Sequence, residues 1–214
     1  MKAPPGASST GDPGEAALRA LPAAASVWVV VFLWRPANFW VLMTLGVGAL
    51  AWWALRVRGP FVLEEGIRPG DALLGVASSA ALYAVFVLGR SAALAVFPPA
   101  ASQIGAVYAL GAHGPAWAVA PALALVIGPG EEVFWRGLVQ WGLVHRLGPL
   151  RGWAAATLVY GLVHLAAGNA LLVVAALAAG AFWGGLYLWC GRLAPVVVSH
   201  VLWDLTVFLL LPLR

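Results

Sequence analysis

Long uncharged, apolar runs separated by short polar connections make up most of this chain. A run such as 37–55 spans nineteen residues, about enough for a helix to cross the roughly 30 Å hydrocarbon core of a bilayer. The pattern therefore predicts an all-α, polytopic membrane helical bundle of about eight transmembrane helices, forming a single membrane domain over residues 20–214. The eight predicted segments are 20–34, 37–55, 72–89, 91–112, 116–145, 152–167, 170–190 and 193–211, of which 116–145 and 193–211 are apolar but contain charged residues.

Polar residues, glycine and proline mark the borders of these runs. Residues 1–19 are rich in Pro, Gly, Ala and Ser, which predicts a disordered N-terminal tail. Arg90 interrupts the apolar sequence between the third and fourth runs, and we expect one helix to end there. In the fifth run Pro129 predicts a break or kink in an otherwise long helix.

Composition excludes a soluble domain and argues against a nucleic-acid partner. Of 214 residues 63% are hydrophobic and only 9% are charged, whereas soluble domains carry roughly 25% charged residues. The net charge of +4 comes from arginines spread along the connections, which is typical of residues that flank a membrane. Cys190 is the single cysteine, so an intrachain disulfide and C-x-x-C motifs are excluded. The expected partner from composition alone is the lipid bilayer.

Three charged residues stand in one of the most apolar parts of the chain, in the stretch GPGEEVFWRG. No other Asp, Glu, Lys or Arg occurs in the forty positions before Glu131. Glu132 and Arg136 are four residues apart, so on a helix they share a face in the favourable acid-first order. Glu131 points about 100° away around the helix and has no such partner. We therefore expect Arg136 to hold Glu132, leaving Glu131 available for proton transfer.

Two further places put ionisable groups at membrane depth. His200 and Asp204 are four residues apart in the last run, and His164 lies near the end of the sixth run. Each place has a structural explanation, since an intramembrane histidine can link two helices and an acid–base pair can be an internal bridge. Three such places on three different helices, all in the second half of the chain, favour a functional site.

The motifs have a recognisable form. Glu131-Glu132 followed by Arg136 gives E-E-x-x-x-R, and His200 with Asp204 gives H-x-x-x-D. Each motif occupies its own predicted membrane helix, and each is weakly specific when taken alone.

The remaining motif is Tyr160-Gly-Leu-Val-His164. Taken together, the three motifs resemble those of the CAAX-processing and bacteriocin-processing (CPBP, or Abi) family of intramembrane proteases, whose patterns are E-E-x-x-x-R, F-x-x-x-H and H-x-x-x-N or H-x-x-x-D. Tyr160 replaces the usual phenylalanine, at a position that we assign to packing. The resemblance covers the motif-bearing part of the chain, about residues 116–211.

The resemblance implies an intramembrane endopeptidase that hydrolyses a peptide bond of a membrane-associated or lipid-modified protein or peptide. Glu131 and His164 would activate a water molecule, and His200 and Asp204 would orient or stabilise the oxyanion. The implied location is the bacterial cell (inner) membrane, with the protein as a multi-pass component. Residues 116–211 would then form the catalytic core of the membrane domain.

The chemistry leaves alternatives open. We expect a metal-free acid/base mechanism without cofactor. Zinc is the alternative, because Glu131, His164, His200 and Asp204 are ligand types that zinc accepts. A proton-coupled transporter would also use membrane carboxylates and histidines, although no repeat of paired broken helices is visible. A catalytically silent interaction or immunity factor is a further alternative.

Overall fold

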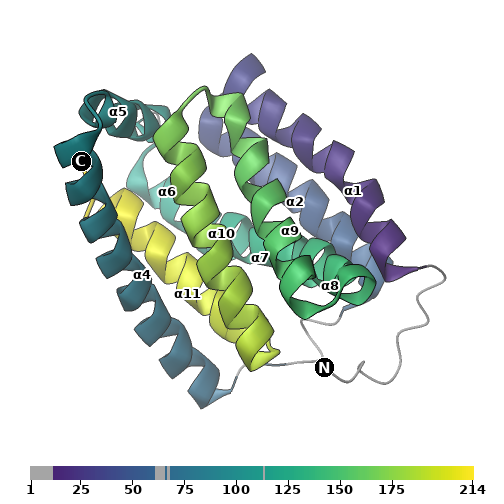
Figure 1. Cartoon of the computed structure of the whole chain (residues 1–214). Helices are drawn as coiled ribbons and strands as arrows, with labels where there is room; N and C mark the ends of the chain where they lie inside the picture. Colours follow the sequence, from purple (N-terminus) through teal and green to yellow (C-terminus); the bar gives the residue numbers. More distant parts are fainter. Residues whose placement is uncertain (1–11, 61–65, 67, 113) are drawn as a thin grey trace.

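The chain folds into helices alone in the part that the computed structural model describes, residues 12–60, 66, 68–112 and 114–214. Within the described residues, several α-helices continue without a gap into π-helical or 3-10 turns, and we call each uninterrupted helical stretch a rod. There are eight such rods, and Figure 1 shows their arrangement. The first four are α1 Pro13–Trp28 with a π-helical turn η1 Val29–Trp34, α2 Phe39–Arg58, α4 Pro69–Val96 and α5 Ala100–Gly111. The fifth is α6 Ala116–Ala122, η2 Leu123–Ile127, α7 Gly128–Phe134, η3 Trp135–Gln140 and α8 Trp141–Leu147. The last three are α9 Pro149–Val163 with η4 His164–Ala167, α10 Ala170–Cys190, and α11 Ala194–Leu205 with η5 Thr206–Leu210.

The predicted all-α membrane bundle of about eight helices is confirmed. Within the described ranges, five rods are long and apolar enough to cross a membrane. The rods of α9 and α11 and the single helix α5 are shorter. The five long rods are Pro13–Trp34, Phe39–Arg58, Pro69–Val96, Ala116–Leu147 and Ala170–Cys190.

The border predicted at Arg90 is wrong. Helix α4 passes through this residue and ends at Val96, just before Phe97 and the Pro98-Pro99 pair. Arginine is a good helix former, whereas proline removes a backbone donor and disfavours helical geometry in the residue before it. The guanidinium of Arg90 reaches the backbone carbonyl of Arg214, so its charge has a partner without any break in the helix.

The start of α1 also corrects a prediction. Residues 13–19, assigned from sequence to a disordered tail, belong to α1, and Ala17 is fully buried. Asp12 caps the helix because its side chain accepts a hydrogen bond from the backbone N–H of Gly14 at 3.1 Å. Pro13 then occupies the first helical position, which suits its fixed φ and missing donor. Residues 1–11 of the predicted tail lie outside the described residues.

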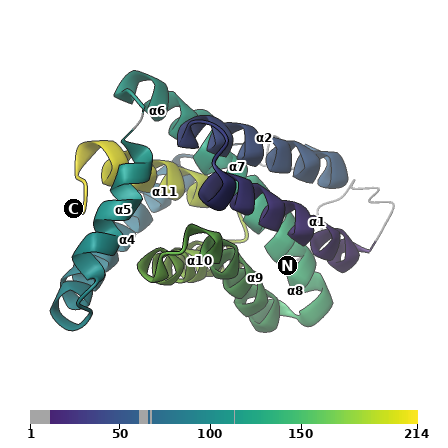
Figure 2. The same cartoon turned by 90° about the horizontal axis from the view of Figure 1, so that it is seen from above.

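The rod Ala116–Leu147 runs through the middle of the bundle. Figures 1 and 2 show α7 between α2 on one side and α9 and α10 on the other, with α11 crossing close by. Its most apolar stretch is 50% buried, against 22–33% for the other four long rods. The charged motif of the sequence therefore lies on the best-shielded rod of the protein.

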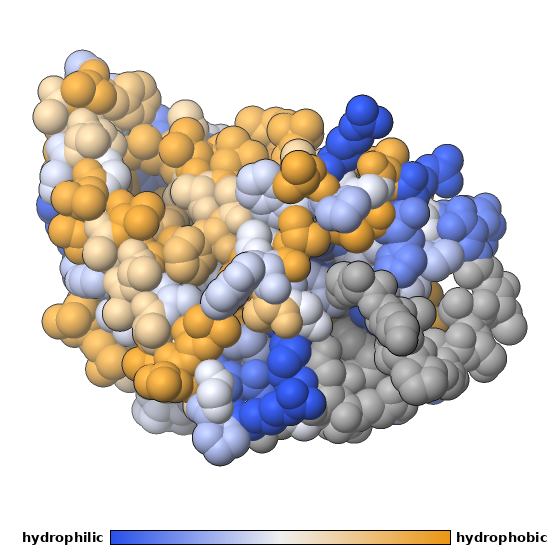
Figure 3. Space-filling view, turned by 60° about the horizontal axis from the view of Figure 1, so that its bottom comes forward, coloured by the Kyte–Doolittle hydropathy of each residue, from blue (hydrophilic) through white to orange (hydrophobic). Residues whose placement is uncertain are grey.

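Apolar side chains cover much of the outer surface. Figure 3 shows broad hydrophobic areas on one face, with hydrophilic residues gathered mainly toward one side. On α4, Leu73 is 72% exposed and Val96 is 80% exposed. Exposed apolar patches of such extent are rare on soluble monomers and suit a surface in contact with lipid chains. The protein is an integral membrane protein.

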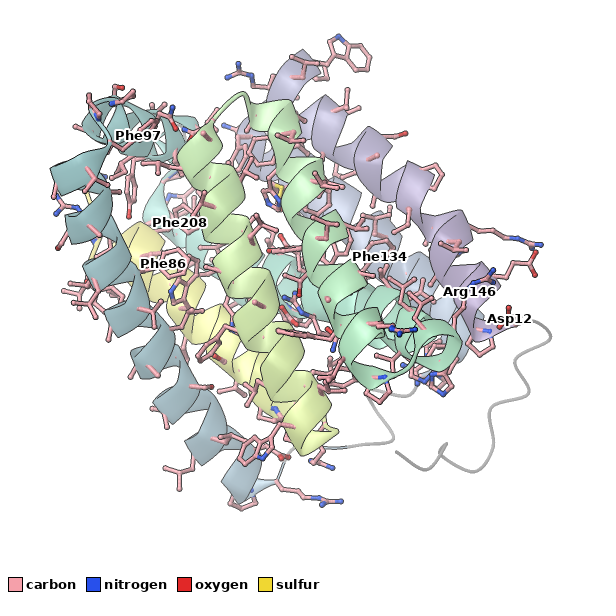
Figure 4. All side chains as sticks on the ribbon, in the orientation of Figure 1. Asp12, Phe86, Phe97, Phe134, Arg146 and Phe208 are labelled. Atoms are coloured by element: carbon pink, nitrogen blue, oxygen red, sulfur yellow. The ribbon has the colours of Figure 1, made fainter. Side chains whose placement is uncertain are left out.

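Two close helix contacts brace the central rod at its C-terminal end. Helix α1 packs along α8, and Asp12 and Arg146 meet there at 3.6 Å (Figure 4). Helix α9 folds back along α8 after Gly148, whose φ of 84° favours glycine. At Gly152 the contact is backbone to backbone, since a Cβ there would lie 2.4 Å from Cα of Val144.

We predict that Gly152→Ala destabilises the protein by about 1–3 kcal/mol or more, because the added methyl meets main chain that cannot turn aside. Gly105→Ala is the matched control, since a Cβ at that helical position meets nothing within 4 Å. Thermal unfolding of the purified protein in detergent measures both variants. Equal melting temperatures would show that α8 and α9 do not pack this closely.

Candidate active site

The two glutamates lie just after Pro129, in a part of the central rod that stays helical. The wide turn η2 comes directly before α7, and the N–H of Gly128 bonds to the carbonyl of Leu123, five residues back. Such π-helical turns absorb local strain in a helix, here that of Pro129, which lacks a backbone donor. The irregularity predicted near Pro129 therefore takes the form of a π-helical turn: the chain stays helical, but α7 begins at Gly128 and Glu131 lies in its first turn.

Glu132 and Arg136 form the predicted ion pair in the interior of the bundle. Arg136 Nη1 donates to Glu132 Oε1 at 3.0 Å, and the two side chains are 0% and 2% exposed. The guanidinium carbon also lies 4.9 Å from the ring centre of Tyr160 and 5.6 Å from that of Trp183. Aromatic faces attract a desolvated cation, so the arginine is held by one carboxylate and two rings.

His200 is a second partner of Glu132, which the sequence did not indicate. Its Nδ1 lies 2.6 Å from Glu132 Oε1, and its Nε2 lies 3.6 Å from Asp204 Oδ2. A carboxylate only accepts hydrogen bonds, so Nδ1 carries the proton and donates it to Glu132. The ring stacks on Trp183 with centres 3.8 Å apart and planes 22° apart. His200 therefore has a fixed orientation, with Nε2 directed toward Asp204.

Glu131 points to a different neighbour. The hydroxyl of Tyr160 donates to Glu131 Oε2 at 2.9 Å, and both side chains are buried. The prediction that position 160 only packs is therefore wrong, because its hydroxyl bonds to the carboxylate that the sequence left without a partner.

His164 begins the turn η4 after α9 and has both ring nitrogens engaged. Trp28 Nε1 donates to His164 Nε2 at 3.1 Å, and His164 Nδ1 lies 2.7 Å from the backbone carbonyl of Tyr160. Indole N–H can only donate, so Nε2 accepts and Nδ1 carries the hydrogen. The imidazole is thus held in a single tautomer.

One cavity of about 360 Å³ connects these groups. Most of the remaining wall is apolar and comes from α2, α4, α5 and α10; it includes Phe86 and Phe208, which Figure 4 labels. Glu132 and Arg136 are absent from the lining and lie behind it. The candidate residues that line the cavity are Glu131, Tyr160, His164, His200 and Asp204.

The donor set does not fit a zinc ion in this arrangement. His164 has one nitrogen bonded to Trp28 and the other to a carbonyl, while both nitrogens of His200 face carboxylates. Across residues 12–60, 66, 68–112 and 114–214, no group of three His, Cys, Asp or Glu side chains is placed to hold a metal ion. The alternative set Glu131, His164, His200 and Asp204 is brought to one cavity but not into a common coordination sphere.

Sequence reasoning missed the aromatic residues that hold the ionisable ones. Trp28 bonds to a residue 136 positions away, and the Tyr160 hydroxyl bonds to one 29 positions away. Trp183 stacks on His200 and donates to Ser199 Oγ at 3.1 Å. The single signal available was the tyrosine in place of phenylalanine at position 160.

We predict that Arg136→Met lowers the free energy of unfolding by about 3–5 kcal/mol, because it leaves the buried carboxylate of Glu132 with His200 as the one partner shown for it among the described residues. Thermal unfolding in detergent measures the loss. The double variant Glu132→Gln/Arg136→Met should recover part of it, since the carboxylate that lost its arginine is then uncharged as well. A single variant as stable as wild type would show that the pair does not carry this energy.

One comparison with known proteins finds a family that covers the part of the chain carrying the three motifs. The family model described as Rce1-like, Type II CAAX prenyl endopeptidase Rce1-like, matches residues 113–206, a range that contains the three motifs. No curated protein and no solved structure matches the chain. Over residues 113–206 the chain is therefore similar to the Rce1-like CAAX-protease (CPBP) family, whose description is that of an endopeptidase.

Proposed function

We propose that this protein is an intramembrane endopeptidase that uses a water molecule activated by Glu131 and His164. Its substrate would be a membrane-associated or lipid-modified protein or peptide, cleaved in the bacterial cell membrane. The observation that supports this most is the shared cavity, in which Glu131, His164, His200 and Asp204 line a wall that is otherwise mostly apolar. Such a cavity accepts an apolar chain and excludes most water, which strengthens the electrostatic interactions inside it.

The first step in this proposal is proton removal from water. Glu131 takes one proton from the water as its oxygen bonds to the carbonyl carbon of the substrate, giving a tetrahedral oxyanion. His164 assists by accepting a hydrogen bond at Nε2 from the other O–H of the water. In this step the water takes the place of the Trp28 N–H, which donates to Nε2 in the structure. The proton held by Glu131 then passes to the leaving nitrogen as the C–N bond breaks. The products are a carboxylic acid and an amine, so one water is consumed for each bond.

His200 is the donor best placed for the oxyanion. In this proposal the His200 ring is doubly protonated: Nδ1–H donates to Glu132, and Nε2–H faces Asp204 and the cavity. An ionised Asp204 only accepts hydrogen bonds, so in this proposal it orients the N–H of His200 and does not itself bind the oxyanion. Glu132 and Arg136 act from behind the lining, by fixing His200.

We predict that Glu131→Gln, His164→Ala and His200→Ala each lower kcat by about 10² to 10⁴-fold, the usual contribution of general acid–base groups. The substrate is an internally quenched peptide with a farnesylated cysteine near its carboxyl terminus, chosen from the substrate class in the family's description. Glu15→Gln is the matched control, because Glu15 is an exposed carboxylate on α1 that pairs with Arg19. Proteomic comparison of membranes with and without the protein extends the search to other substrates. Three variants that cleave as fast as wild type would rule out this mechanism.

We also propose that the reaction needs no bound metal, because both nitrogens of His200 face carboxylates and, among the described residues, no three candidate ligands are placed to hold one ion. The expected result is that chelator treatment of the purified protein leaves the cleavage rate unchanged and that added zinc does not raise it. Loss of activity on chelation with recovery on zinc addition would contradict this and favour the zinc alternative.

A further inference from the structure

Tyr160 stands between the two groups that the proposed function assigns to water activation. Its hydroxyl donates to Glu131 Oε2 at 2.9 Å, and its backbone carbonyl accepts from His164 Nδ1 at 2.7 Å. One residue thus bonds the carboxylate through its side chain and the imidazole through its main chain. The spacing follows from helix geometry, since residues 160 and 164 are four apart at the end of α9.

The tyrosine ring itself has little freedom. Trp135 packs edge-on at 5.2 Å between ring centres, and the guanidinium of Arg136 lies 4.9 Å from the ring centre. On the side of α10 the ring packs against Gly180, where a Cβ would lie 3.0 Å from a ring carbon of Tyr160. The hydroxyl is therefore held at a defined point by a ring that is packed from several sides.

The hydrogen bond from Tyr160 makes the two carboxylate oxygens of Glu131 different from each other. Oε2 accepts the phenol hydrogen, while no donor is bonded to Oε1 among the residues that the structure describes. Because Glu131 lines the cavity, Oε1 is the oxygen left to accept a proton from bound water. Without the hydroxyl of Tyr160, the carboxylate of Glu131 would be free to rotate. Its Oε2 would also be left without a hydrogen bond, which is costly for a buried polar atom.

We infer that Tyr160 is a positioning residue: its hydroxyl fixes the carboxylate of Glu131, and its carbonyl fixes the tautomer of His164. The inference rests on the proposed function for its effect on catalysis, but the contact itself can be tested separately. Packing alone would need only the ring, which phenylalanine supplies equally well. The hydroxyl is what this chain adds, and its partner is the carboxylate.

Tyr160→Phe in the full-length protein tests the inference, since it removes the hydroxyl and keeps the ring and the carbonyl. Tyr83→Phe is the matched control, because the Tyr83 hydroxyl bonds to the carbonyl of Leu211 and the residue does not line the cavity. With the farnesylated peptide we expect kcat to fall about 10- to 100-fold in the first variant, as for a misplaced catalytic group. KM should stay within twofold, because the hydroxyl touches Glu131 and not the substrate. The control should match wild type in both constants.

Chemical labelling provides the readout that does not depend on activity. Dicyclohexylcarbodiimide reacts with carboxyl groups in apolar surroundings, and peptide mass spectrometry locates the product. We expect Glu131 to be labelled several-fold faster in Tyr160→Phe than in wild type or Tyr83→Phe, because an oxygen that accepts a strong hydrogen bond is a poorer nucleophile. Glu131→Gln should lose the label at that position.

The two readouts separate the possible failures. Should wild type leave the peptide and all membrane proteins uncut, the proposed function fails, and the labelling rates alone decide whether Tyr160 fixes Glu131. Equal labelling of wild type and Tyr160→Phe overturns the inference, whatever the activity. Faster labelling with an unchanged kcat also overturns it, since the hydroxyl would then bond to the carboxylate without positioning it.

Discussion

The buried carboxylate of Glu132 is the constraint on which the site depends. A charge in the interior of a membrane protein is costly unless it is paired, and Glu132 Oε1 accepts from both Arg136 and His200. One bond stays within the central rod and the other reaches α11. The same carboxylate thus neutralises a cation, joins two helices and sets the direction in which the imidazole of His200 points.

Aromatic rings form the next layer around these charges. Trp183 stacks on His200, and its ring also lies near the guanidinium of Arg136. The hydroxyl of Tyr160 bonds to Glu131, and the ring of Tyr160 lies near the same guanidinium. Rings tolerate an apolar environment and still offer an N–H or O–H at one edge. In a bundle with few polar residues, they supply both the packing and the donors that orient the ionisable groups.

Local patterns could be predicted from the sequence, and contacts between helices could not. The pair Glu132 with Arg136 follows from a spacing of four residues on one helix, and the membrane helices follow from the length of the apolar runs. The bonds of Trp28 to His164 and of Tyr160 to Glu131 depend on how rods pack, which no spacing encodes. Pro129 indicated an irregularity in the helix, but its form, a π-helical turn within a rod that stays helical, could not be predicted from the sequence.

The position of Trp28 has a consequence for how this chain should be divided into parts. The family model begins at residue 113, yet an indole from the first helix bonds to the imidazole of His164. A chain cut before residue 116 would keep every motif and lose one of the two bonds that hold that ring. The part that can be recognised by sequence is therefore smaller than the part that holds His164 in place, and the first helix belongs to the second.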